Sequence, residues 1–146
     1  MSHNRRRDIL AALFITAVTV AAGPVAAETP SPAGAVVYFI NLKDGDTVTS
    51  PFKVQFGLSG IGVAPVGVQT PNTGHHHLII DTQLSPEQMQ QPIPADDQHR
   101  HFGGGQTETM LTLPSGPHTL QLVLGDWSHI PHNPPVMSSV IKITVK

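Results

Sequence analysis

Hydrophobic and polar positions alternate along much of this chain, which is the periodicity of strands and not of helices. The clearest case is Phe52–Leu58, where apolar residues occupy every second position and Lys53 and Gln55 stand between them. Successive side chains of a strand point to opposite faces, so this alternation predicts an antiparallel strand with one buried face.

Five further segments are predicted to be strands: Val36–Asn41, His75–Asp81, Thr107–Leu113, His118–Leu124 and Ser139–Lys146. Turn signals and Gly/Pro-rich loops separate them. The turn at Pro114–Pro117 predicts that the strands on either side of it pair as a hairpin. The only helical element expected is a short turn at Ser85–Gln90.

Short strands joined by turns predict an all-β fold, an antiparallel β-sandwich of immunoglobulin-like type. The chain has no cysteine, so the Cys…Trp…Cys arrangement of antibody domains is excluded. Residues 36–146 are the size of a single His-rich domain, and residues 28–35, rich in Pro and Ser, are expected to be a flexible leader.

The N-terminus has the pattern of a cleaved signal peptide over residues 1–27. Arg5-Arg6-Arg7 precedes an apolar run to Val20, and small residues at Val25–Ala27 form a cleavage site. The apolar run is too short and too interrupted for a stable membrane span. We therefore expect a periplasmic or secreted protein, exported by the Sec or the twin-arginine route.

The mature chain is acidic, which excludes some classes of partner. Residues 28–146 contain five Lys and Arg against nine Asp and Glu, a net charge of −4 with neutral histidines. A negative surface argues against nucleic acid and provides no basic patch for membranes. Without cysteine there is no disulfide or thiolate metal site, so any metal must bind nitrogen, oxygen or thioether ligands.

Histidine is the residue type that indicates a functional site, because its side chain can bind a metal. The chain has nine, and eight of them follow the predicted signal, six in pairs at metal-chelating spacing. An H-x-H pair on a strand sets two imidazoles side by side on one face, so His76 cannot join its neighbours. The candidate metal ligands are His75, His77, His99, His101, His129 and His132.

Other residues can support such a site. Asp81, Glu108 and Asp126 are candidates to accept an imidazole N–H behind the ligands. Met137 would favour cuprous copper as a thioether ligand, although a packing role is the preferred interpretation. Trp127 is expected either in the core or as the apolar wall of a pocket, and the core is the preferred interpretation.

A structural role stays open for every histidine, because imidazoles also satisfy buried backbone groups. His118 is expected to have that role. His76 is expected to be a packed or solvent-facing residue.

Four blocks in order resemble the exported bacterial domain-of-unknown-function family numbered 4399: Gly74–Asp81, His101–Glu108, Leu113–Leu120 and Gly125–Val136. The resemblance extends from Val37 to Lys146. It implies an exported single domain and carries no established activity.

Three functions remain open from the sequence. The preferred one is an exported module that binds a divalent transition metal, zinc or copper, through its clustered histidines. The second is a metal-free protein or glycan interaction domain whose histidines pin loops. The third is a metal-dependent hydrolase with Glu108 or Asp126 as general base, disfavoured because neither G-x-S-x-G nor HExxH occurs.

Overall fold

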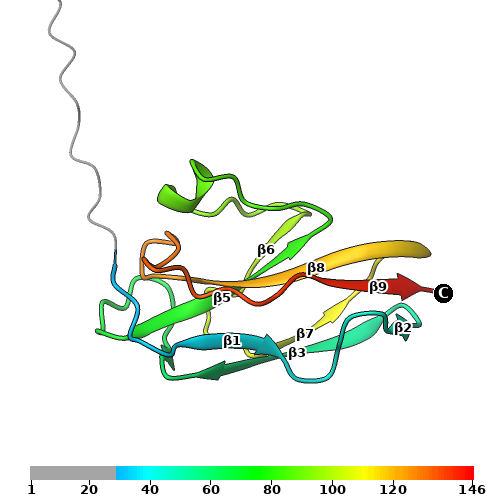
Figure 1. The fold of residues 1–146 in the computed structure, drawn as a ribbon, viewed down its shortest axis with the longest axis horizontal. Coiled ribbons are helices and arrows are strands. Elements are labelled where there is room, and N and C mark those ends of the chain that lie inside the picture. Colours follow the sequence, from blue (N-terminus) through cyan, green and yellow to red (C-terminus); the bar gives the residue numbers. More distant parts are fainter. Residues whose placement is uncertain (1–28) are drawn as a thin grey trace, which may run out of the picture.

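The alternating segments form strands, which the computed structural model, describing residues 29–146, arranges in two sheets (Figure 1). The smaller sheet has the order β1-β3-β7, with both neighbouring pairs antiparallel. Its strands are β1 (Val36–Phe39), β3 (Phe52–Ser59) and β7 (Glu108–Leu111).

The larger sheet has the order β2-β9-β8-β5-β4, and β6 also pairs with β5. Its long pairs, β5 with β8 and β8 with β9, are antiparallel, whereas the two-residue strands β2 and β4 pair in parallel. The bounds are β2 (Thr47–Val48), β4 (Gly62–Val63), β5 (Thr73–Ile80), β6 (His99–His101), β8 (Gly116–Gly125) and β9 (Ile141–Val145).

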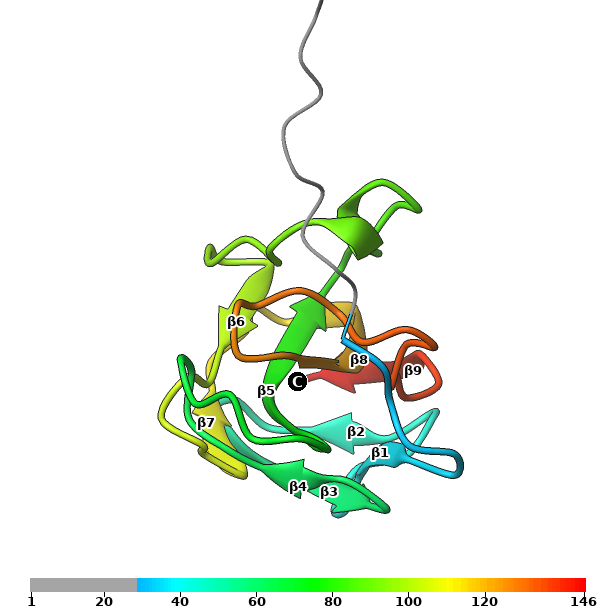
Figure 2. The ribbon, with the colours of Figure 1, turned by 90° about the vertical axis from the view of Figure 1, so that its left-hand side faces the viewer.

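The two sheets face each other across one hydrophobic core, as the end view shows (Figure 2). Alternate side chains of each layer enter it, among them Val54 of β3, Leu78 of β5 and Leu122 of β8, all fully buried. The predicted all-β sandwich is therefore confirmed.

A second, smaller cluster of Ile79, Ile93 and Val123 lies outside the core. Ile79 and Val123 belong to β5 and β8, so the connection that contains Ile93 covers the outer face of the larger sheet at this point. The same connection holds the 3-10 turn η1 (Gln88–Gln90), within the predicted helical segment. None of the helices described in residues 29–146 is long and apolar enough to cross a membrane.

The predicted hairpin around Pro114–Pro117 is wrong. β7 pairs with β3 and β8 pairs with β5 and β9, so this turn carries the chain from one sheet to the other. Leu111 and Leu120 reach the same core from opposite layers. Alternation shows which face of a strand is buried and not which strand lies beside it, so a crossing between sheets satisfies the pattern equally well.

The start of the described chain lies against the segment that follows β8. Asn133 N donates to Thr29 O at 3.0 Å, and Ser31 N donates to Asn133 O at 3.3 Å. The predicted signal peptide falls outside the described residues.

Candidate metal centre

The histidine run lies on β5, which is buried from Gly74 to Ile80 because strands flank it and loops cover its outer face. Strand alternation directs His76 into the core, where its ring lies 5.1 Å from that of Phe56. His75 and His77 point to the opposite, outer face, with ring centroids 4.9 Å apart.

A third imidazole reaches the same place from β6. His101 pairs in register with His77, and its ring centroid lies 5.1 Å from that of His77 and 5.0 Å from that of His75. One ligand nitrogen from each of these residues lies within 4.8 Å of the other two. We refer to His75, His77 and His101 as the three-histidine group.

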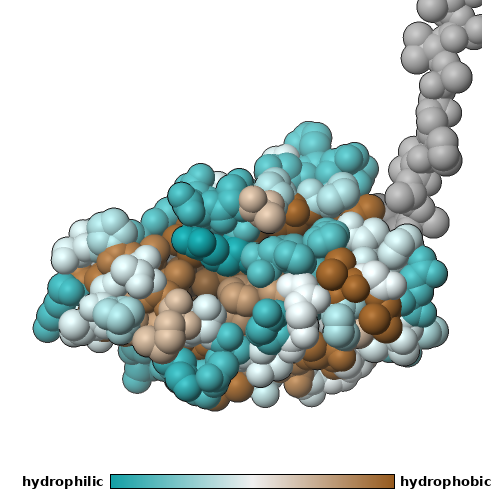
Figure 3. All heavy atoms as spheres, turned by 180° about the vertical axis from the view of Figure 1, so that it is seen from behind, coloured by the Kyte–Doolittle hydropathy of each residue, from teal (hydrophilic) through white to brown (hydrophobic). Residues whose placement is uncertain are grey.

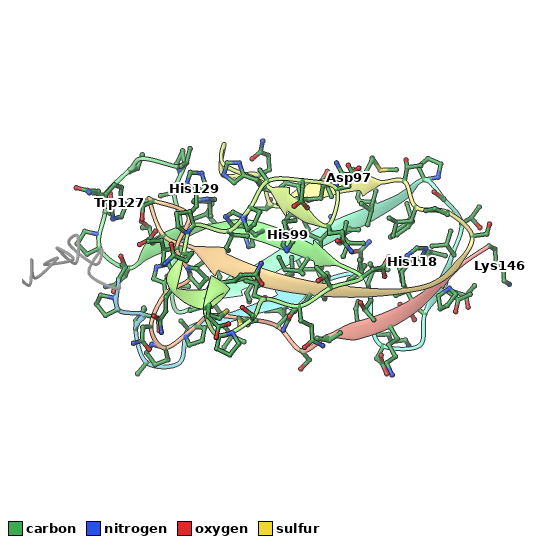
Figure 4. The ribbon with its side chains drawn as sticks, turned by 90° about the horizontal axis from the view of Figure 1, so that it is seen from above. Asp97, His99, His118, Trp127, His129 and Lys146 are labelled. Carbon is green, nitrogen blue, oxygen red and sulfur yellow. The ribbon has the colours of Figure 1, made fainter. Side chains whose placement is uncertain are left out.

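A fourth ring packs against this group from the loop after β8. The centroid of His129 lies 4.7 Å from His101, 5.2 Å from His75 and 6.1 Å from His77. His129 has a φ of 72°, a left-handed conformation that is uncommon outside glycine. Figure 4 places His129 at the same end of the molecule as Trp127, with His99 further along.

Two glycines make room for the rings. A Cβ at Gly125 would lie 2.8 Å from Nε2 of His77, and one at Gly103 would collide with the ring of His101. Such contacts are too short for any other residue without movement of the neighbour. The spacing of the histidines does not point to Gly125, whose only sequence signal is a glycine at the end of an apolar strand.

Asp126 braces the loop that carries His129. Its side chain is buried and accepts hydrogen bonds from Thr29 Oγ1 at 2.6 Å and from the backbone N–H groups of Ser128 at 2.8 Å and Ile130 at 3.0 Å. Burial would raise the pKa of this carboxyl, but these hydrogen bonds lower it. A negative charge is thus fixed beside the histidines.

Burial keeps the three-histidine group neutral. It lowers the pKa of His77 to about 2 and that of His75 to about 4, and the neighbouring imidazoles add to the effect. The pKa of His101 is also lowered, by burial first and His129 second. Asp126 opposes the shift at His75. A neutral imidazole has a free lone pair, which is the form that binds metals.

Within residues 29–146, three nitrogens of the group have no hydrogen-bond partner. They are Nδ1 of His75, Nδ1 of His77 and Nε2 of His101, and all three are buried. The Nε2 atoms of His75 and His77 lie 3.1 Å from each other. A buried polar atom left unpaired costs about 1–3 kcal/mol, so several at one place require an explanation.

Two of the six predicted ligands lie away from both the three-histidine group and His129. His99 shares β6 with His101, but its Nδ1 donates to Asp96 Oδ1 at 2.8 Å. His132 is buried with its nitrogens near backbone carbonyls, Nε2 at 3.2 Å from Thr73 O and Nδ1 at 3.4 Å from Leu124 O. The structure thus brings together four of the six predicted ligands.

Of the three predicted supporting carboxylates, one lies beside the three-histidine group and two lie elsewhere. Asp81 accepts from a histidine, but from His118 at the far end of β5, at 2.6 Å. Glu108 lies on β7 of the other sheet and pairs with Lys53 at 2.9 Å. Only Asp126 adjoins the group, and its hydrogen bonds go to backbone and hydroxyl groups.

Comparison with known families gives one match. The family described as Domain of unknown function (DUF4399) matches residues 54–146, the part of the chain that runs from β3 through every histidine of the site. No curated protein and no solved structure matches the chain.

Proposed function

Because the chain belongs to the DUF4399 family, whose description names no ligand, its function must be inferred from the site, and we propose that it binds a divalent transition metal. The three-histidine group supplies the ligands. His129 is the proposed fourth, since its ring already lies against all three.

The observation that carries this proposal is the convergence of buried imidazole nitrogens that have no oxygen partner. Two nitrogens that share a tetrahedral metal at ~2.0–2.1 Å lie about 3.3 Å apart. The Nε2 atoms of His75 and His77 are separated by 3.1 Å. The pair thus has the spacing of one edge of a coordination tetrahedron.

The ligand chemistry favours zinc or copper(II). All ligands are imidazoles, which suit both ions and are unsuited to calcium or magnesium. A thioether would favour copper(I), but Met137 packs against the small cluster of Ile79, Ile93 and Val123.

Binding is favoured over hydrolysis. A hydrolytic metal site needs a carboxylate free to take a proton from the metal-bound water. Glu108 lies on the other sheet, and the oxygens of Asp126 already accept four hydrogen bonds. Near the group, the described residues therefore offer no free general base.

Metal analysis of mature, untagged protein tests this proposal. We expect one zinc or copper ion per chain by elemental analysis or by titration after chelation, with affinity lost in His77→Ala and His101→Ala. His99→Asn is the matched control, because His99 is two residues from His101 on the same strand but bonds to Asp96. Metal binding that is absent, or unaffected by the two alanine variants, would reject the proposal.

We also propose that the metal is bound outside the cytoplasm, on the basis of the signal pattern in residues 1–27. Cell fractionation of the full chain should yield a processed product of 119 residues in the periplasm or medium. Replacement of Arg6-Arg7 by lysines would block export by the twin-arginine route and spare the Sec route. An unprocessed chain in the cytoplasm would contradict export.

A further inference from the structure

The loop that carries His129 also carries Trp127, the only tryptophan of the chain. Its predicted place in the core is wrong, because the residue is 42% exposed. Gly67 N donates to Trp127 O at 2.9 Å, which ties this residue to the loop between β4 and β5. Exposed indole rings are enriched at binding sites, because they combine a large apolar face with a polar edge.

Trp127 forms one wall of a cavity of about 290 Å³. The other walls are Thr29, Pro30 and residues 68–73. This volume is close to the lower end of the range for small-molecule pockets. Apolar and polar surface alternate on this part of the molecule, at the right of Figure 3.

The polar side chains that line the cavity are neutral. Those of Thr29 and Thr73 already donate hydrogen bonds, to Asp126 and to Thr70 O, and the other three are free to bind a ligand. These three are Gln69, Thr70 and Asn72, whose side chains form no hydrogen bond within residues 29–146. Together they offer two amides and a hydroxyl, which both donate and accept. Charged side chains do not occur among the described residues that line the cavity.

From this combination we propose that the cavity is a binding site for a neutral carbohydrate. The flat indole of Trp127 can stack on the apolar C–H face of a pyranose ring, and amides and hydroxyls suit its hydroxyl groups. A phosphate or carboxylate would find no cation there. A peptide that binds by adding a strand would need a free strand edge, but residues 64–72 contain no strand. This site is separate from the proposed metal function and does not depend on it.

Titration of the mature protein in EDTA with cellotriose, maltotriose and triacetylchitotriose tests the proposal. Trp127 reports directly, as the single tryptophan, and we expect a saturable change in fluorescence with at least one trisaccharide, at about millimolar affinity. By calorimetry, Trp127→Ala should weaken binding by roughly tenfold or more. Gln69→Ala should weaken it less, and His99→Asn should leave it unchanged.

Three results would overturn the proposal. The first is no saturable response to any of the three sugars. The second is sugar binding that persists unchanged in a Trp127→Ala protein whose circular dichroism is that of the parent. The third is saturable binding of a tetraproline peptide, lost in the same variant, which would assign the cavity to a peptide instead. Because EDTA removes metal, none of these results bears on the three-histidine group.

Discussion

Imidazole rings at the two ends of β5 have opposite kinds of surroundings, although the two ends belong to one strand. At its C-terminal end, His118 donates from Nδ1 to Asp81 Oδ2 at 2.6 Å and from Nε2 to Pro114 O at 2.9 Å. Both partners are acceptors, so the two hydrogen bonds together favour the doubly protonated ring. Burial alone would lower the pKa of His118, but these hydrogen bonds outweigh it and raise the pKa.

At the other end of β5, the rings of His75 and His77 have no oxygen acceptor among residues 29–146, and their pKa values are lowered. One end thus favours a protonated imidazole, and the other favours neutral imidazoles with a free lone pair. The number of clustered histidines therefore does not identify a metal site. The atoms opposite each ring nitrogen do.

The largest expected effect of this difference is on stability in acid. Unfolded histidines bind protons near pH 6.5, whereas folded His75 and His76 do so only near 4 and His77 near 2. The unfolded chain therefore takes up more protons as the pH falls, and the metal-free protein should lose a few kcal/mol between pH 7 and pH 5. Urea denaturation in EDTA across this range measures it.

His76→Leu tests how much one buried histidine contributes to this loss of stability. It removes one buried imidazole from the core without touching the three-histidine group, so the loss between pH 7 and pH 5 should become smaller. A stability that is flat with pH in the parent protein would contradict the assigned protonation states.

The next largest effect is expected from Gly125→Ala. The new methyl group would lie 2.8 Å from Nε2 of His77, and the ring must move away. Metal affinity should fall roughly 10–100-fold, as it does when the supports of other metal ligands are disturbed. Gly62→Ala is the matched control, since its Cβ would make only an ordinary contact of 3.4 Å. Equal affinities in the two variants would refute this role for Gly125.

A smaller effect is expected at the Asp81 end. His118→Leu removes both hydrogen bonds and should destabilise the protein by about 1–2 kcal/mol at pH 6, since Asp81 is partly exposed. His118 has a raised pKa, so its contribution is fully present below pH 6.5 and is lost as the pH rises through the folded pKa. Parent and variant should therefore converge in stability at alkaline pH. A constant difference would contradict the charged state.

Alternation was enough to predict the sandwich, because each strand buries one face. The same alternation did not predict which strands pair with each other. The turn at Pro114–Pro117 has the composition of a hairpin turn, yet it joins two sheets. Local composition fixes where a chain turns, whereas the choice of neighbour depends on how the whole core closes.

The candidate site was likewise predictable only in part. The H-x-H spacing identified His75 and His77 because strand geometry puts them on one face. The same spacing failed to separate His99 from His101, because the difference lies in Asp96, which accepts a hydrogen bond from Nδ1 of His99. The approach of His129 depends on a left-handed backbone and on Asp126, neither of which the spacing encodes.

The smallest effect concerns charge beside the metal. Asp126→Asn keeps an oxygen that can accept from Ser128 and Ile130 but removes the negative charge that favours a cation near His75. We expect zinc affinity to fall roughly threefold to tenfold. Asp81→Asn, the same change at the other end of β5, should weaken the hydrogen bond from His118 and leave zinc affinity unchanged. If calorimetric titration finds the two variants alike, Asp126 acts only as a brace for its loop, and the contrast between the two ends of β5 lies in hydrogen bonding alone.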